Sequence, residues 1–391
     1  MVLDELKEWL YGCTHCGTCK SLLETFTPAC PAGNRYKLES YYASGKMLIA
    51  RGVVEGALDL EDEDVLERIY ACTGCLNCEQ ICGVFHHQHI FDFVQALRTE
   101  AVTRGALNPA YMVMVDGLRK EDNVFGKPKA ERGAWARDLA VKTAAGDPVE
   151  TVYHAGCLLS FDEELRDVPR SAIALLRAAG EDPGIMAEEE SCCGGRAYEI
   201  GYTGEFTKYA EHVIQTFNTL GVKQVVTSCS DGYGTFKKLY PSVGIEMKFG
   251  VRHMVEYLAG LVAEKKLAFT TPVPMKVTWH DPCHIGRHLG EDGLYDAPRT
   301  VLQTIPGIEV IEMERNRENA YCCGAGAGVS QSDPDLALWT ANERLQEAAA
   351  TGAEALVTAC PWCERNFRDA LESYGGDMKI LDIAELARRA L

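Results

Sequence analysis

The segment VKQVVTSC at residues 222–229 recurs as AEALVTAC at residues 353–360, and this repetition sets the architecture of most of the chain. Upstream of each segment, YHAGC at 153–157 matches WHDPC at 279–283. Both pairs are separated by roughly 130 residues, a constant offset that indicates one domain present in two copies.

Each copy also carries a pair of adjacent cysteines, in SCCGG at 191–195 and YCCGA at 321–325. Short apolar segments alternate with amphipathic ones, such as GEFTKYAEHVIQTFNTLG at 204–221. Alternating strands and helices predict an α/β layer with a parallel sheet. The cysteines follow the strands, at the sheet edge where such folds place their sites. We therefore expect two α/β domains that face each other through these edges.

The first block, to about residue 110, carries eight cysteines and helical patterns such as HIFDFVQALRTEAVTRG at 89–105. Three cysteines spaced by two residues can bind three corners of a cubane, and the fourth ligand comes from further along the chain. In two-cluster ferredoxins, that fourth cysteine serves the other cluster. The pattern predicts two [4Fe–4S] clusters, one bound by Cys13, Cys16, Cys19 and Cys82, the other by Cys72, Cys75, Cys78 and Cys30.

Zinc is the alternative for this block, because CxxC pairs also build zinc ribbons. Zinc sites usually use two such pairs, whereas this chain has two triplets, each with a distant fourth partner. We therefore predict an α+β multidomain protein, in which a helical ferredoxin-like domain precedes two α/β domains. The expected bounds are 1–110 for the ferredoxin-like domain, 111–148 for a connector, 149–270 for the first copy and 271–391 for the second.

The second copy gathers five cysteines, namely Cys283, Cys322, Cys323, Cys360 and Cys363. Adjacent cysteines cannot readily provide two corners of one ordinary cubane together with three more thiols. Five converging thiolates therefore predict an unusual cluster, or a cluster plus a reactive thiol. A disulfide and a zinc ion are the alternatives. His280, His284 and His288 lie beside Cys283 and are candidate hydrogen-bond donors or proton sources.

The first copy repeats four of these cysteines as Cys157, Cys192, Cys193 and Cys229. Gly232 stands where Cys363 would align, so the set is incomplete. Four thiols can hold zinc or a conventional [4Fe–4S] cluster, or they can merely stabilise the domain. We assign no catalysis to this copy.

Composition narrows the functional classes further. The formal net charge of -18 argues against nucleic-acid binding and fits docking on basic patches of redox partners. No apolar run approaches the ~18–20 residues of a membrane span, and no secretory leader is recognisable, so we expect a cytoplasmic protein.

Seventeen cysteines in a reducing compartment indicate metal ligands or redox thiols. The chain lacks the glycine-rich dinucleotide fingerprint that flavin or nicotinamide binding would need.

The ordered motifs CTHCGTC, CTGCLNCEQIC and two copies of C…CCG…C resemble the heterodisulfide reductases with cysteine-rich CCG domains, in particular the D-type subunit. The resemblance covers nearly the whole chain. It implies two cubanes in the N-terminal domain and a noncubane [4Fe–4S] cluster bound by the five cysteines of the second copy. It also implies disulfide reduction by successive one-electron transfers.

Our mechanistic hypothesis is that the leaving thiolate is protonated by His284 or a neighbour. The partners implied are a flavoprotein or other redox subunits, and possible membrane cytochromes. Related CCG proteins also serve as electron-relay subunits of glycolate or lactate oxidases and of benzoyl-CoA reductase assemblies. A relay subunit without its own substrate is therefore the competing hypothesis.

Overall fold

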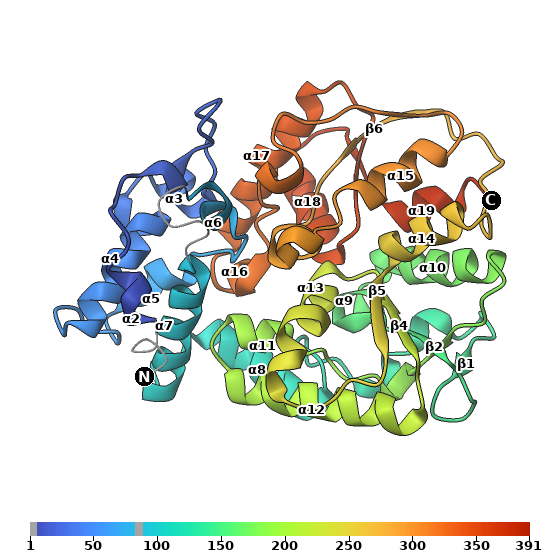
Figure 1. Ribbon diagram of the computed structural model, residues 1–391, viewed down its shortest axis with the longest axis horizontal. Helices are drawn as coiled ribbons and strands as arrows, with labels where there is room; N and C mark the ends of the chain where they lie inside the picture. The colour runs from blue at the N-terminus through green and yellow to red at the C-terminus, as the bar shows by residue number, and fades with distance from the viewer. Residues whose placement is uncertain (1–5, 83–88) are drawn as a thin grey trace.

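A computed structural model describes residues 6–82 and 89–391 of the chain. Figure 1 shows three parts: the N-terminal part at the left in blue, the first α/β copy in green and yellow, and the second copy in orange and red. No helix within the described residues is long and apolar enough to cross a membrane.

The N-terminal part is helical, and its described residues contain no β pairing beyond one isolated bridge between Ser21 and Pro28. Local signals start and stop the helices: the side chain of Asp62 caps α5, and Gly105, with φ of 82°, ends α7. Its elements are α2 (Lys7–Leu10), η1 (Thr18–Lys20), α3 (Pro31–Tyr36), η2 (Glu39–Tyr41), α4 (Ala43–Val54), α5 (Glu63–Tyr70), α6 (Asn77–Ile81), α7 (Ile90–Arg104) and α8 (Pro109–Glu121).

The first copy is built on a parallel sheet with the strand order β1-β3-β2-β4-β5. Its strands are β1 (Lys142–Thr143), β2 (Thr151–Tyr153), β3 (Gly184–Ile185), β4 (Gln224–Thr227) and β5 (Gly250–His253). Its helices are α9 (Gly156–Phe161), α10 (Asp167–Ala178), α11 (Gly195–Glu199), α12 (Thr203–Leu220), α13 (Ser230–Gly234) and α14 (Met254–Ala263), with shorter turns η3 (Lys129–Glu131), η4 (Ala134–Ala136), η5 (Glu163–Leu165), η6 (Ala187–Glu189), η7 (Thr235–Leu239) and η8 (Tyr240–Val243).

The second copy repeats this plan with a parallel sheet in the order β7-β6-β8-β9. Its strands are β6 (Met275–Trp279), β7 (Ile308–Val310), β8 (Ala355–Thr358) and β9 (Lys379–Asp382). Its helices are α15 (Asp296–Thr304), α16 (Val329–Ser332), α17 (Pro334–Ala350), α18 (Pro361–Tyr374) and α19 (Ile383–Arg388), with turns η9 (Cys283–Ile285), η10 (Arg287–Asp292), η11 (Arg317–Asn319) and η12 (Gly326–Gly328).

The predicted fold class is confirmed, because helices precede two α/β units whose central strand order is the same. Residues 111–148, which we expected to be a connector, do more than connect. Their strand β1 pairs with β3 and extends the first sheet at its edge.

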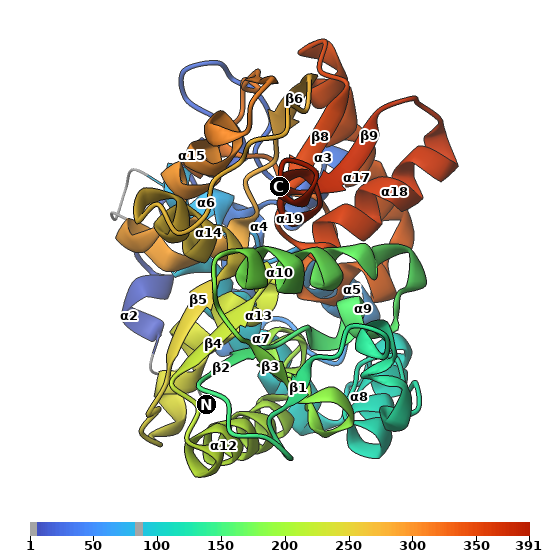
Figure 2. The same ribbon diagram turned by 90° about the vertical axis from the view of Figure 1, so that its right-hand side faces the viewer.

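The two copies pack face to face through their cysteine-bearing edges. Helices α10 and α14 of the first copy pack against α19 of the second (Figure 2). Helix α13 packs against η9. At the centre of this contact, Ser230 Oγ donates a hydrogen bond to the carbonyl of Ala359 at 2.7 Å. The loops after β4, β6 and β8 therefore converge on one buried region between the sheets.

Candidate metal centres

The structure gathers the first predicted set of ferredoxin-type cysteines around one cavity of about 370 Å³. This cavity is lined by Cys13, Cys16, Cys19 and Cys82 together with the apolar side chains of Met47 and Ile90. Cys16 is exposed, whereas burial raises the pKa of Cys19 to about 11. This centre therefore has one side open to solvent.

The second predicted set lines a separate cavity of about 400 Å³, whose cysteines are Cys30, Cys72, Cys75 and Cys78. Phe91 makes part of its apolar wall, and Ile90 lines both this cavity and the first, so the two cavities are neighbours. Burial raises the pKa of Cys30 to about 11. A thiol in such surroundings ionises only when a cation compensates its charge.

The separation of these thiols distinguishes a cluster from a single ion. Zinc with bonds of ~2.3 Å to sulfur places its tetrahedral ligands ~3.8 Å apart. Among the described residues, no three of the eight sulfur atoms lie within 4.8 Å of one another. Both cavities therefore fit a polynuclear iron–sulfur cluster better than a mononuclear zinc ion.

The five cysteines of the second copy are positioned by three loops at the sheet edge. Cys283 begins η9 after β6, and Cys360 caps α18 so that Cys363 lies in the first turn of that helix. Hydrogen bonds from the thiols of Cys322 and Cys363 lower the pKa of Cys323 to about 6. Such mutual contact requires the CC pair and the CxxC pair to converge in space.

A histidine joins this group, because an imidazole nitrogen of His280 lies within 4.8 Å of the sulfur atoms of Cys323 and Cys363. Burial, together with the Arg344 guanidinium, holds the pKa of His280 well below its usual value, so the ring is neutral. These three residues could hold a zinc ion, and Cys283, His284 and His288 form a second group whose ligand atoms lie within 4.8 Å of one another, but Cys322 and Cys360 would then remain without a metal. The full donor set fits a larger sulfur-rich cluster.

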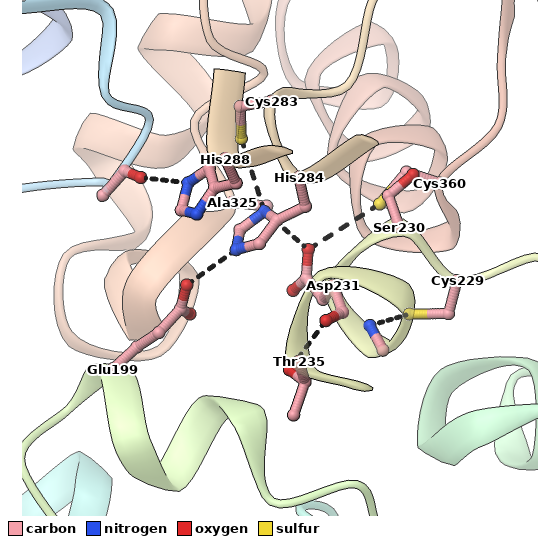
Figure 3. Close-up of polar contacts among 12 residues, drawn as sticks. Glu199, Cys229, Ser230, Asp231, Thr235, Cys283, His284, His288, Ala325 and Cys360 are labelled. Atoms are coloured by element: carbon pink, nitrogen blue, oxygen red, sulfur yellow. Dashed lines mark hydrogen bonds and ion pairs between the residues drawn. The ribbon is translucent and has the colours of Figure 1, made fainter. Parts of the chain in front are cut away.

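His284 links the two copies at the centre of the buried region (Figure 3). Its Nδ1 lies 3.4 Å from Cys283 Sγ and 3.2 Å from Asp231 Oδ1, and its Nε2 lies 2.8 Å from Glu199 Oε1. Burial alone would lower the pKa of His284, but Asp231, Cys283 and Glu199 raise it well above its usual value. The ring therefore carries a proton on both nitrogens, one of which faces the sulfur of Cys283.

Asp231 connects this network to the remaining thiols of the second copy. Its Oδ1 accepts a hydrogen bond from Cys360 Sγ at 3.9 Å, and its Oδ2 accepts one from Arg196 at 3.0 Å. Arg196 stacks on the ring of Trp362, with 3.6 Å from the guanidinium carbon to the ring centroid. The first copy thus supplies charged side chains to the metal centre of the second.

The loop that carries Cys72 and Cys75 docks on this same centre. Hydrogen bonding with Cys322 and burial raise the pKa of Cys75 well above its usual value, so these two thiols are in contact. Arg287 Nε donates to the carbonyl of Cys75 at 2.7 Å, and His288 Nε2 lies 2.7 Å from the carbonyl of Gly74. A Cβ on Gly326 would approach Thr73 O at 2.3 Å, so only glycine permits this close packing.

The first copy holds its four cysteines differently. Cys157 and Cys192 are in contact, and Cys229 occupies the N-cap position of α13, as Cys360 does in α18, but its sulfur also accepts a hydrogen bond from the backbone N–H of Gly232. Arg132 Nη2 donates to Cys157 Sγ at 3.2 Å, and its Nη1 forms a buried ion pair with Glu190 at 3.0 Å. The first copy therefore has a guanidinium at the edge of its thiol group.

Replacing Arg132 by leucine should destabilise the protein by about 3–5 kcal/mol, because the Glu190 carboxylate would stay buried without its partner. We expect a clearly lower midpoint of thermal unfolding. Arg137, exposed and five residues further along the same segment, is the matched control, and its change to leucine should cost less than about 0.5 kcal/mol. Equal midpoints for both variants would contradict a structural role of the Arg132–Glu190 pair.

Several residues of these centres were not predicted from the sequence. Arg132 lies in the segment expected to be a connector, and Glu199 lies on α11 without any motif. The sequence did carry a signal for Asp231 as a site residue, because it lies between Cys229 and the glycine that replaces the fifth cysteine. His86 and His87, which follow Cys82 closely in the sequence and could flank the first cluster, lie outside the described residues, which begin again at residue 89.

Comparisons with known proteins match this layout. The family model of the cysteine-rich CCG domain matches residues 151–237 and 277–368, and that of the 4Fe-4S dicluster domain matches residues 9–85. The chain is 30% identical to the D-type subunit of the dihydromethanophenazine:CoB–CoM heterodisulfide reductase of Methanosarcina mazei, over 98% of this chain and 94% of that protein. It is 31% identical to the EtfAB:quinone oxidoreductase of Syntrophomonas wolfei, over 83% of this chain and 47% of that protein.

Among solved structures, a hypothetical protein from Helicobacter pylori superposes with a TM-score of 0.59 at 12% identity. The match covers 88% of this chain and 67% of the other. At this level of identity the likeness concerns the fold alone.

Proposed function

Since the chain belongs to the family of D-type heterodisulfide reductase subunits, we propose that it passes electrons from a redox partner to its second CCG copy, where a disulfide is reduced. That it is an iron–sulfur oxidoreductase subunit follows from the family and the domain matches. The disulfide, the partner and a cytoplasmic location belong to the proposal. A flavoprotein is the favoured partner, and a membrane cytochrome is the other candidate.

One observation carries the proposal: Arg287 Nε donates to the carbonyl of Cys75 at 2.7 Å and His288 Nε2 lies 2.7 Å from the carbonyl of Gly74, which brings the thiol of Cys75 beside that of Cys322. Cys75 belongs to the second ferredoxin-type set and Cys322 to the five-cysteine set of the second CCG copy. This contact makes a short path from the N-terminal domain to the second copy, while Ile90 lines both ferredoxin-type cavities. Three adjacent centres in a row suit electron transfer toward a buried terminal site.

We assign the ligands of each proposed cluster from the cysteines that the structure brings together at each site. Cys13, Cys16, Cys19 and Cys82 would hold one cubane, and Cys72, Cys75, Cys78 and Cys30 the other. Cys283, Cys322, Cys323, Cys360 and Cys363 would hold the noncubane cluster. Bound there, iron–sulfur clusters supply one-electron transfer and a Lewis-acidic iron for sulfur.

The side chains around the second copy supply the protons. Reducing a disulfide to two thiols consumes two electrons and two protons. The raised pKa of His284 favours a protonated ring, whose Nδ1 lies 3.4 Å from Cys283 Sγ and 3.2 Å from Asp231 Oδ1, and Glu199 on its far side holds the ring in place. A thiolate that leaves a disulfide beside Cys283 would therefore meet a proton donor, which makes it a better leaving group.

The first copy lacks the fifth thiol, and its geometry allows a direct test. Gly232 occupies the same place in α13 as Cys363 in α18, three residues after the capping cysteine. A Cβ on Gly232 would meet Cys229 Sγ at 3.8 Å and nothing closer than 3.6 Å, which is ordinary contact. A cysteine at this position therefore fits, with its sulfur beside the existing set.

We expect Gly232→Cys to create a second complete five-thiol site that binds additional iron. Anaerobic iron and sulfide analysis should show a higher iron content than in the wild type, together with a second noncubane EPR signal. Gly232→Ser adds a side chain of the same shape without the sulfur and should leave the iron content unchanged. The same iron content in the cysteine variant would contradict the equivalence of the two positions.

The alternative is a relay subunit that has no substrate of its own, and the incomplete first copy favours it. Holoprotein reduced with a viologen dye and supplied with a panel of low-molecular-weight disulfides separates the two. Disulfide-dependent oxidation of the dye supports the reductase. Oxidation by flavoprotein or quinone acceptors, with none by any disulfide, supports the relay.

A further inference from the structure

Three buried cations surround the second ferredoxin-type cavity. Lys46 lines the cavity itself, and Arg98 Nη2 donates to the carbonyl of Cys72 at 2.7 Å. Arg287 Nε donates to the carbonyl of Cys75 at 2.7 Å. The exposed fractions of Lys46, Arg98 and Arg287 are 2%, 0% and 8%, so water screens none of them.

None of the three cations has a carboxylate partner within the described ranges, because all their acceptors are backbone carbonyls. Lys46 Nζ donates to the carbonyl of Tyr41. Arg287 Nη1 donates to the carbonyls of Glu318 and Ala320 at 3.0 and 2.8 Å. Arg98 donates to the carbonyls of Ile69, Tyr70, Cys72, Glu199 and Ala327, which belong to all three parts of the chain.

Buried charges without counter-ions are costly, so a structure keeps them where an opposite charge compensates them. A candidate carboxylate, that of Glu79 beside Cys78, accepts a hydrogen bond from the backbone N–H of Phe91 at 2.6 Å rather than from any of the three cations. The remaining anion is the metal centre itself, since a [4Fe–4S] cluster with four thiolate ligands is net negative in both redox states. Positive charge nearby favours the reduced, more negative state and raises the reduction potential.

The first ferredoxin-type cavity has a different environment. Apart from its cysteines, the lining formed by the described residues is Thr14, His15, Gly17, Thr18, Ser44, Met47 and Ile90, without lysine or arginine. Lys20, the cation that interacts with Cys19, is ion-paired with Glu39 and about one-third exposed. The exposed Cys16 also opens this centre to water.

We propose that Lys46, Arg98 and Arg287 set the order of the redox centres, by holding the second cubane at a higher reduction potential than the first. Electrons then enter at the exposed first centre and move downhill to the second, beside the second CCG copy. Each transfer moves one electron, oxidises the first centre, reduces the second and requires no proton. This direction rests on the proposed function, but the order of the two potentials is measurable without any substrate.

The test is an anaerobic EPR-monitored redox titration of the holoprotein, with Cys16→Ser used to identify the signal of the first cubane. In the wild type, the second cubane should have the higher midpoint potential. Lys46→Met should lower that potential, with at least a tenfold smaller equilibrium constant for one-electron reduction, or 59 mV. The potential of the first cubane should stay unchanged. A lower or equal potential for the second cubane in the wild type would overturn the proposal.

Arg98 must be tested with a series of substitutions, because its hydrogen bonds connect three parts of the chain and its loss could affect folding. Arg98→Lys keeps the charge and should keep the potential, whereas Arg98→Met should lower it. Arg104→Met on the same helix removes an equal charge from a more exposed side chain, ion-paired with Glu100, and should move neither potential. If Arg98→Met does not fold, Lys46→Met decides, and an unchanged potential in that variant contradicts the assignment. Disulfide turnover is measured separately, so a failed proposed function would leave this result intact.

Discussion

Replacing Cys363 by serine should abolish the signal of the second CCG copy and reduce disulfide turnover to the background rate, while both cubane signals remain. Cys363 is 3% exposed, contacts Cys323 and lies in the first turn of α18, so serine fits the space but cannot supply a soft thiolate ligand. The measurement is EPR of the anaerobically reduced protein together with turnover in the dye assay.

The control for this variant is Cys229→Ser, which changes the equivalent thiol group of the first copy. It should leave the noncubane signal of the second copy in place, because Cys229 is not among the five ligands assigned there. Undiminished disulfide turnover in Cys363→Ser would show that the second copy is not the catalytic centre.

Replacing His284 by glutamine should lower disulfide turnover roughly 10²- to 10⁴-fold, the usual contribution of a positioned proton donor. The glutamine amide nitrogen can still donate to one of the two carboxylates that contact the native ring, those of Glu199 and Asp231, but it has no acidic proton to give. Oxidation of the reduced protein by ferricyanide needs no proton and should proceed at the wild-type rate. This pair of measurements separates proton delivery from electron transfer.

His288→Gln is the matched control, because its ring stacks on that of His284 with centroids 3.9 Å apart. Burial and the neighbouring His284 charge hold the pKa of His288 well below its usual value, so it has no acidic proton to deliver. Equal losses of turnover in the two variants would mean that packing, rather than proton donation, explains the role of His284.

Much of the architecture was predictable from local patterns. The repeat and the alternation of apolar segments predicted two α/β copies, and strand order repeats between them as expected. The spacing of the N-terminal cysteines predicted that Cys82 and Cys30 would exchange partners, and the structure places each in the cavity of the other triplet. Their role as iron ligands stays a prediction until metal is measured.

The charged residues around the centres could not be predicted from the sequence, because their hydrogen-bond and ion-pair partners lie far away along the chain. Arg98 joins carbonyls as far apart as Ile69 and Ala327, and Asp231 of one copy contacts His284 of the other. Such contacts depend on how the copies pack, which no periodicity encodes. Arg132 had no signal at all, since it lies in a segment without a motif.

Rapid mixing of the fully reduced holoprotein with excess disulfide, followed by freeze-quench EPR, would test electron delivery to the second CCG copy. We predict that both cubane signals disappear at the rate of thiol formation in the wild type and persist in Cys363→Ser. The two proteins should be oxidised equally by ferricyanide. Cubane signals that persist in the wild type with every disulfide tried, yet disappear with ferricyanide, would contradict the proposed path.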